Sequence, residues 1–245
     1  MPRPTLSTFS RLADDPQVKP LRPGDGAPLT VQAYDAIRAI LFRGVFQQGE
    51  TLRMEELCDR LQTSKQPIAD AFKRLAHEGY LTIVPQVGCH VRCYSRDEVR
   101  DYYRLYAAAE GLLAELAAQR ALPHQLQALE AVSAEIGRLV SAPSPRRQEA
   151  VRYRQLNREF HRLVREAAAS CLVAEGAEAM HDRSDFFTVT MHHAVRADRL
   201  QRAHEEHEAL LTVLRVRDGR AARAAMEHHV LSVGARLWEP DGVGR

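Results

Sequence analysis

Apolar residues recur at three- and four-residue intervals along most of the chain, which is the pattern of amphipathic helices. Within residues 54–80 this pattern forms two short stripes that are separated by a polar break. The first stripe consists of Met54, Leu57 and Leu61, and the second of Ile68, Ala71, Phe72 and Leu75. We therefore predict a short helix, a sharp turn and a second helix whose outer side is polar and basic.

The turn and the second helix have the features of a helix-turn-helix that reads DNA. Ser64 is placed to act as an N-cap, with its hydroxyl accepting a hydrogen bond from a backbone N–H of the next turn. Pro67 falls in the first turn, where its missing N–H costs little. The second helix of such a motif fits the major groove. The candidate DNA contacts are Arg53, Ser64, Lys65, Gln66, Lys73 and Arg74, with Gly88 and His90 beyond the helix.

Two short β-prone runs follow this helix. They cover residues 80–84 and 89–94 and are separated by a Pro-Gln-Val-Gly turn that ends at Gly88. A two-stranded ribbon directly after a recognition helix makes a winged helix, and a glycine at its tip permits close approach to a phosphate backbone. The alternative on this pattern alone is an ordinary three-helix bundle with a hairpin, since helical hairpins are common.

From residue 95 onward the pattern is helical, without a convincing strand. Ser95 and Glu98 form a capping-box sequence that opens a long helix to about residue 120. Its inner side is predicted to carry Tyr102, Leu105, Tyr106, Ala109, Leu112, Leu113 and Leu116. Further helices are predicted over residues 123–140, 146–168, 170–189, 199–217 and 219–238. We expect these helices to pack on one another in a bundle.

The chain is thus predicted to be mainly α-helical, with two domains. The 245 residues are enough for two domains of ordinary size. We assign a disordered tail to residues 1–28, a winged helix-turn-helix to 29–94, an all-α antiparallel bundle to 95–238 and a second tail to 239–245. The first tail is assigned because that segment is rich in Pro, Ser, Asp and Gly and shows no period.

Composition and charge narrow the classes of function. The formal net charge is only +2, so binding to nucleic acid has to come from one face and not from bulk charge. The four cysteines have no C-x-x-C spacing, which favours free thiols. No apolar run is long enough to span a membrane, and the N-terminus lacks an apolar signal core. We therefore expect a cytoplasmic protein with no membrane partner.

The helical half contains nine of the eleven histidines. Asn157 and His161 are four residues apart and share one helix face, while His207 and His229 lie beside the apolar stripes of two other predicted helices. Three imidazoles that converge in a bundle, together with an oxygen ligand, suit zinc, nickel or a similar ion. The spacing alone leaves open that these histidines are scattered structural or surface residues.

Two stretches resemble a known family of transcription regulators. Residues 29–91 resemble the winged-helix domain of the GntR family through the run YDAIRAILFRGVFQQGETLRMEELCDRLQTSKQPIADAFKRLAHEGYL and the wing VPQVGCHV. Residues 95–238 resemble the helical effector domain of its FadR-like subfamily, called FCD, through AEGLLAELAA, LNREFHRLVREAA and EEHEALLTVLRVRDGRAARAAMEHHV. The resemblance implies a ligand-responsive repressor that binds a palindromic DNA operator as a homodimer and is not an enzyme.

The resemblance also implies two ligand sites in the helical domain. A divalent metal, zinc first and nickel or manganese as alternatives, is expected on Asn157, His161, His207 and His229. Because Asn157 is neutral, it is a weaker ligand than a carboxylate. A small-molecule effector is expected near Tyr106, Glu110, His192 and His204.

The sequence departs from the family pattern at three places. Ala69 stands where the family usually has an arginine, and Gln86-Val87 replaces a basic or Asn-Arg pair before the wing glycine. Both changes remove expected DNA contacts and point to an unusual operator. Tyr106 stands where the family often has an arginine that grips a carboxylate effector. A phenol replaces a bidentate arginine poorly, so this departure points to an effector that is less acidic than the family's usual organic acids. An organic acid stays the alternative.

Two other functions remain open at this point. Three histidines with an open coordination position can activate water, as in a metal-dependent hydrolase. The sequence has no H-E-x-x-H, no G-x-S-x-G and no Gly-rich phosphate loop, which weighs against catalysis. The apolar side chains of Ala69 and Val87, at positions where a basic residue would bind DNA, also fit a helical interaction module that does not bind DNA.

Overall fold

The structure is a computed structural model that describes residues 12, 18–24, 26–85, 88–141, 147–191 and 197–238. The chain separates into two compact units. The first unit runs to Tyr94 and also takes in the end of the long helix α8 (Cys171–Met191), from Phe186 onward. The second unit holds the remaining residues from Ser95. The first unit therefore draws on a helix that the sequence pattern assigned entirely to the second.

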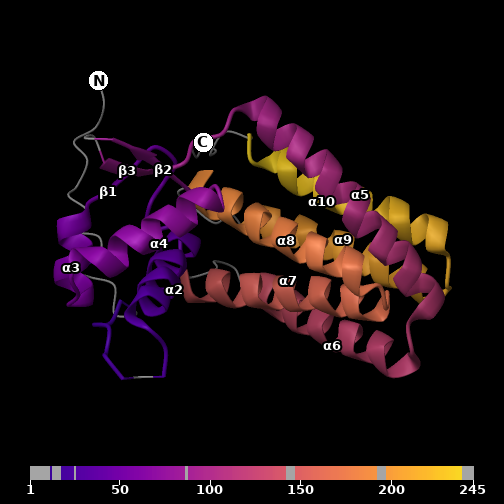
Figure 1. Cartoon of the computed structure of the whole chain (residues 1–245). Helices are drawn as coiled ribbons and strands as arrows, with labels where there is room; N and C mark the ends of the chain where they lie inside the picture. The colour runs from indigo at the N-terminus through magenta and orange to yellow at the C-terminus, as the bar shows by residue number, and fades with distance from the viewer. Residues whose placement is uncertain are drawn as a thin grey trace. The chain divides into compact units, whose positions relative to one another are not determined.

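The first unit contains a helix-turn-helix and a small three-stranded sheet (Figure 1). Its elements are α2 (Leu29–Phe42), β1 (Thr51–Leu52), α3 (Met54–Leu61), α4 (Lys65–His77), β2 (Leu81–Val84) and β3 (Gly88–Val91). The strands are antiparallel in the order β1-β3-β2. Val84 pairs with Gly88, so β2 and β3 form the wing. Gln86 and Val87, at its turn, lie outside the described residues.

The apolar stripes of α3 and α4 lie in the core of this unit, as the sequence pattern predicted. Leu57 and Leu61 of α3 are fully buried, and so are Ile68 and Leu75 of α4. Ile37 of α2, the helix on which α4 packs, is fully buried as well. Burying a side chain of this size stabilises the fold by roughly 1.5–3 kcal/mol. This packing turns the polar side of α4 toward solvent.

Two local features differ from the sequence prediction. β1 was not predicted, because two residues are too few to show a period and its pairing with β3 arises only in the fold. Ser64 occupies the N-cap position of α4 with an extended backbone, but its hydroxyl accepts no capping hydrogen bond. The chain turns before it at Gln62, which adopts a left-handed φ of 51°.

Part of the segment before α2 belongs to this unit. Leu12 and Val18 are buried, and the backbone N–H of Leu21 donates to the carbonyl of Leu61 at 2.8 Å. We expected a disordered tail over residues 1–28. Leu12, Val18 and Leu21 are anchored, because their apolar side chains or backbone groups find partners in the unit. Residues 1–11 and 13–17 lie outside the described residues, so the assignment of the tail as a whole stays a prediction.

The second unit is a bundle of long helices, with no strand among its described residues. Its helices are α5 (Arg96–Arg120), α6 (Pro123–Val140), α7 (Arg147–Ala167), the first part of α8, α9 (Ala197–Arg215) and α10 (Gly219–Arg236). Figure 1 shows α5 beside α10 and α6 beside α7. α9 packs on both α6 and α10. None of the described helices is long and apolar enough to cross a membrane.

Helix α5 begins as the sequence predicted but buries a different side. The Ser95 hydroxyl accepts the backbone N–H of Glu98 at 3.2 Å, and the Glu98 carboxylate accepts the N–H of Ser95 at 2.8 Å, which confirms the capping box. Tyr103 is buried where Tyr102 was expected, and Leu105, also expected inside, is 60 % exposed. Because α5 contacts α7 as well as α10, its buried arc is rotated from the single stripe that we predicted.

Candidate metal centre and nucleic-acid interface

Three histidines from three helices converge in the core of the second unit. His161 lies on α7, His207 on α9 and His229 on α10, and each is at most 3 % exposed. The ring centroids are 5.7 Å apart for His161 and His207, 5.4 Å for His161 and His229, and 4.6 Å for His207 and His229. One ring nitrogen of each lies within 4.8 Å of the others. The structure thus brings together the three histidines that the sequence singled out, hereafter the histidine trio.

The apolar stripes of the helices turn these rings inward. Phe160 is fully buried and stacks on His207, with 4.3 Å between the ring centroids. Leu210 lies one turn after His207, Met226 lies one turn before His229, and both are buried. Residues three or four positions apart share a helix face. Burying the apolar neighbours therefore directs the imidazoles into the core.

Two imidazoles of the histidine trio are held by carboxylates. His161 Nδ1 lies 2.9 Å from Glu110 Oε2, and His229 Nδ1 lies 2.8 Å from Glu206 Oε2. An ionised carboxylate only accepts hydrogen bonds, so Nδ1 of each ring carries the hydrogen and Nε2 keeps its lone pair. A carboxylate in this position fixes the orientation of the ring and raises its basicity toward a metal.

His207 has no hydrogen-bond partner for either ring nitrogen among the described residues, although both nitrogens are buried. A buried polar group without a partner is costly, and metal ligation removes that cost. Zinc binds histidine nitrogen at about 2.1 Å in tetrahedral geometry, which sets the nitrogens about 3.4 Å apart. Small ring rotations bring nitrogens that lie within 4.8 Å to that spacing. The donor set therefore fits a divalent metal.

The buried imidazoles are held in their neutral form. Burial lowers the pKa of His161 and of His229, and their carboxylate partners oppose this shift without reversing it. The pKa of His207 lies well below its ordinary value because of burial and then because of the neighbouring histidines. Since a neutral imidazole is the form that binds metal, the histidine trio is in its ligating form at neutral pH.

Glu110 is also the partner of a buried arginine. Arg165 Nη1 donates to Glu110 Oε1 at 2.8 Å, and the two side chains are 5 % and 0 % exposed. Burial alone would raise the pKa of the Glu110 carboxyl, but His161 and Arg165 outweigh it and lower that pKa to about 2. Glu206 is arranged in the same way, because its other oxygen accepts from Arg236. Each carboxylate behind the histidine trio is therefore already paired with an arginine.

A fourth histidine, His181 on α8, lies beside the histidine trio and was missed in the sequence analysis. Its ring centroid is 5.0 Å from that of His161, and its Nδ1 lies 2.9 Å from the Tyr106 hydroxyl. Its Nε2 is buried without a hydrogen-bond partner among the described residues, 3.8 Å from Asp185 Oδ2. Burial lowers the pKa of His181 to about 3 and raises that of Tyr106 well above its ordinary value. Both groups are therefore neutral.

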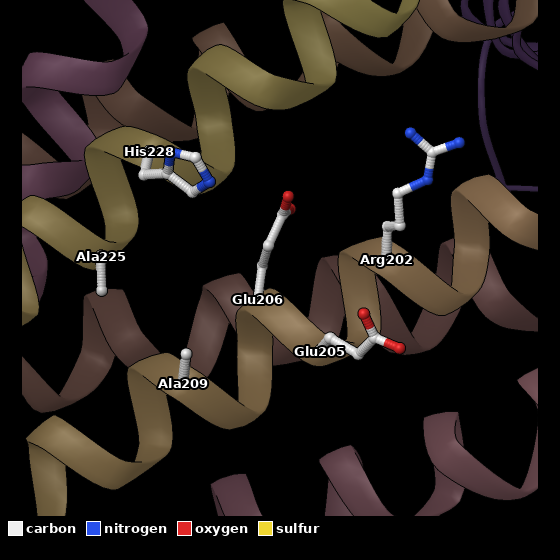
Figure 2. Close-up of a pocket in the computed structure, with 6 residues that line it drawn as sticks. All are labelled: Arg202, Glu205, Glu206, Ala209, Ala225 and His228. Atoms are coloured by element: carbon white, nitrogen blue, oxygen red, sulfur yellow. The ribbon is translucent and has the colours of Figure 1, made fainter.

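Glu206 also reaches the surface of the bundle. A pocket of about 300 Å³ lies between α9 and α10 (Figure 2). It is lined by Arg202, Glu205, Glu206, Ala209, Ala225 and His228. In Figure 2 the carboxylate of Glu206 rises between the two helices, whereas that of Glu205 points away from α10. A group that enters this pocket meets the carboxylate that holds His229.

Three further residues were expected at the metal site or near the effector. Asn157 lies one turn before His161 on α7 and is half-buried. His204 packs against α6, with its Nε2 2.8 Å from the position that a Cβ on Gly137 would occupy. His192 lies outside the described residues.

The outer face of α4 is exposed and carries the expected DNA contacts, Lys65, Gln66, Lys73 and Arg74. Its three basic side chains are paired within the chain, as Lys65–Glu55 at 3.2 Å, Lys73–Asp70 at 3.2 Å and Arg74–Glu78 at 3.1 Å. Exposed ion pairs contribute little to stability, so a phosphate displaces such an acid readily. The face is polar and basic, yet its charges are balanced.

The remaining candidate contacts surround this helix. Ser64 is exposed at the start of α4, and the Arg53 side chain is 64 % exposed at the start of α3. On the wing, Gly88 is exposed with a φ of 136°, a conformation that favours glycine. His90 is half-buried, with Nδ1 3.0 Å from Thr51 Oγ1. All of these residues belong to the first unit.

Family models match both units of the chain. The model described as bacterial regulatory proteins, gntR family, matches residues 29–91, and the model of the FCD domain matches residues 101–232. The chain belongs to the GntR family. Within this GntR regulator the histidine trio lies in the stretch that matches the FCD model, and α4 lies in the stretch that matches the gntR model.

The GntR regulator is similar to named repressors along most of its length. It is 27 % identical over 210 residues to the HTH-type transcriptional repressor RspR of Escherichia coli (strain K12), a match that covers 84 % of this chain and 87 % of that one. It is 26 % identical to the repressor GlaR of the same strain, over 83 % of this chain and 94 % of that one. Its fold is similar to that of E. coli McbR/YncC, with a TM-score of 0.70 and 19 % identity over 87 % of this chain and 98 % of that one. RspR and GlaR are both named as transcriptional repressors and not as enzymes, and the likeness to McbR/YncC concerns the fold.

Proposed function

We propose that this chain is a repressor that binds a palindromic operator as a dimer and responds to a small effector held beside a divalent metal in its second unit. One observation carries the proposal, namely that two sites occur in the same chain. The first is the exposed, polar and basic face of α4. The second is the buried histidine trio, in which His207 has no hydrogen-bond partner among the described residues. The names of RspR and GlaR support repression as the direction of control. A bacterial regulator of this kind acts in the cytoplasm, where its operator lies.

The proposed DNA interface is the outer face of α4 together with the wing. In a helix-turn-helix, the second helix lies in the major groove and its N-terminal residues reach the base edges. Lys65 and Gln66 occupy that end of α4, and Lys73 follows two turns later on the exposed side. Gly88 and His90 on the wing would contact the phosphate backbone. Two such units related by a twofold axis read a palindromic site.

The metal is proposed to bind His161, His207 and His229, with Asn157 as an oxygen donor. Three imidazoles with one oxygen ligand suit zinc, and nickel or manganese are the alternatives. The support is the donor set itself: neutral rings, two of them oriented by carboxylates and the third without a partner among the described residues. When bound, the metal would supply a buried positive charge that attracts an oxygen ligand.

The charges around the histidine trio favour an anionic effector. Glu110 is paired with Arg165, and Glu206 with Arg236, so neither carboxylate is left to balance a metal. A divalent ion bound only by neutral ligands leaves positive charge uncompensated in the core, which is costly. A carboxylate or similar oxyanion would balance that charge. Tyr106 led us to expect a less acidic effector, and Arg165 does not replace the missing arginine because it is paired with Glu110. The positive charge of the metal is what favours an anionic effector.

His181 is proposed to hydrogen-bond the effector. Its Nε2 is buried without a hydrogen-bond partner among the described residues, and its ring lies next to that of His161. When the Tyr106 hydroxyl donates to Nδ1, the neutral tautomer carries its hydrogen on Nε2 and can donate to an effector oxygen. An effector acts on DNA binding only through its difference in affinity between two states of the protein.

The test measures binding of the full-length protein to fluorescent duplexes that tile its own promoter region. We expect binding that selects one duplex over its scrambled version and weakens steeply with salt. Chelation followed by addition of zinc, with and without a panel of small carboxylates, is expected to change that affinity. Equal binding to the scrambled duplexes would reject the DNA-reading role. Loss of thermal stability on chelation without any DNA binding would indicate a helical interaction module instead.

A further inference from the structure

Asp70 lies in the middle of the exposed side of α4. Its carboxylate accepts a hydrogen bond from Gln66 Nε2 at 2.9 Å and another from Lys73 Nζ at 3.2 Å. Spacings of four and three residues put these side chains on one side of the helix. The Asp70 side chain is 38 % exposed. The carboxylate is therefore held in one orientation and still open to solvent.

Asp70 is the one acid in the sequence of α4. The other acids that pair with basic residues of this helix lie outside it: Glu55 is on α3, and Glu78 follows the last residue of α4. The preceding residue is Ala69, so position 69 adds no second basic side chain beside the carboxylate that Lys73 already contacts. A helix that lies in the major groove on this side would bring Asp70 toward the bases.

The chemistry of this carboxylate distinguishes between bases. The hydrogen bonds from Gln66 and Lys73 lower the pKa of Asp70, so it is ionised at neutral pH. An ionised carboxylate has about four acceptor positions, and these two hydrogen bonds use two of them. In the major groove, cytosine presents an amino donor and no acceptor, adenine presents an amino donor beside its N7 acceptor, and guanine and thymine present only acceptors. A carboxylate that faces acceptors is left unpaired and is repelled, which costs affinity.

We propose that Asp70 is a specificity-determining residue that accepts a hydrogen bond from the amino group of a cytosine at one position of each operator half-site. Gln66 and Lys73 hold the carboxylate in place, and its charge opposes binding to sites without that donor. The proposal rests on the proposed DNA-reading function of α4. In this proposal Asp70 also weakens binding to DNA that lacks the matching base. An aspartate is not attracted to phosphate, so it lowers the affinity for non-specific DNA.

The test is selection from a pool of duplexes with a randomised central segment, carried out with the full-length protein. Wild type, Asp70→Ala and Glu55→Ala are compared. The two variants are matched, because each removes one exposed acid that is paired with a lysine of α4, but only Asp70 lies on α4 itself. Thermal unfolding of all three proteins checks that the fold is kept.

We expect wild type and Glu55→Ala to enrich the same inverted repeat, with cytosine preferred at one position of each half-site. Asp70→Ala is expected to keep the rest of the repeat and to lose the cytosine preference by about tenfold, with tighter binding to random duplex. An unchanged repeat in Asp70→Ala would overturn the proposal, and so would a preference at the Asp70-dependent position for a base other than cytosine. If wild type enriches no sequence, the proposed DNA-reading function itself fails, and the role of Asp70 falls with it.

Discussion

Glu110 and His161 are 51 residues apart in the sequence and share a 2.9 Å hydrogen bond in the core of the helical unit. Arg165, one turn after His161 on the same helix, donates to the other oxygen of Glu110 at 2.8 Å. One carboxylate thus joins α5 to α7 at two points and orients an imidazole of the histidine trio. Stability and ligand binding depend on the same side chain.

Removal of the charge of Glu110 is expected to destabilise the protein strongly. Glu110→Gln keeps the shape of the side chain but leaves Arg165 buried without a counter-charge, which costs roughly 3–5 kcal/mol in free energy of unfolding. The double variant Glu110→Gln with Arg165→Met is expected to recover much of that loss. The control is Glu135→Gln, which breaks the exposed pair with Arg152 and should stay within about 0.5 kcal/mol of wild type. Urea unfolding measures all four proteins, and equal losses in Glu110→Gln and the control would contradict the prediction.

Metal content is expected to depend on His229 and not on its neighbour His228. His229 is 3 % exposed and belongs to the histidine trio, whereas His228, at the preceding position of α10, is exposed. His229→Ala should lower zinc affinity by at least about 100-fold, because losing a ligand costs more than losing a residue that only hydrogen-bonds a ligand. His228→Ala should leave the zinc affinity unchanged. Titration calorimetry and elemental analysis after dialysis provide the measurement. Equal zinc content in the two variants would argue against a metal on the histidine trio.

The carboxylate behind His229 is expected to tune the same affinity. Glu206→Gln weakens acceptance of the Nδ1 hydrogen and lets the ring turn, which should lower zinc affinity by about 10–100-fold. Glu205→Gln is the matched control, because Glu205 lines the same pocket and its carboxylate points away from α10. Competition against a zinc-binding dye compares the two variants. A loss of similar size in both would indicate a general effect of surface charge.

Stability of the metal-free protein is expected to fall as the pH drops below about 6.5. Burial lowers the pKa of His181 from its ordinary 6.5 to about 3, so between these values the unfolded chain binds a proton that the folded protein does not. The stabilisation is complete above pH 6.5 and is lost as the pH falls toward 3. Urea midpoints at pH 7, 6 and 5 in the presence of chelator measure the slope. His181→Gln should flatten this slope, and an equally steep slope in that variant would assign the effect to other groups.

An arginine at position 69 is expected to strengthen DNA binding without adding selectivity. Ala69→Arg places a cation on the half-exposed side of α4, where it can reach a phosphate. One added phosphate contact steepens the dependence of log affinity on log salt by about 0.9. The control is Ala131→Arg, which adds the same charge at an exposed site on α6. A salt slope that changes equally in both variants would show that net charge, and not the position on α4, controls binding.

Local pattern was sufficient for most of the secondary structure. The stripe of Ile68 and Leu75, the capping box at Ser95 and the break between α9 and α10 are read from neighbours a few residues apart, and helix formation depends on those same neighbours. The side of α5 that is buried was not predictable in this way. Leu105 is apolar but exposed, because two partner helices and not one stripe decide which arc of α5 is covered.

The sequence by itself determined the order of helices, the helix-turn-helix with its exposed polar side, and the helix faces that carry His161, His207 and His229. Only the tertiary structure decided that these three faces meet, that His181 joins them and that Arg165, in a highly charged run, is buried against Glu110. Periodicity specifies which side of a helix is apolar, but the partner of that side is chosen by packing between segments far apart in the chain. The interactions that make the site are all of this long-range kind.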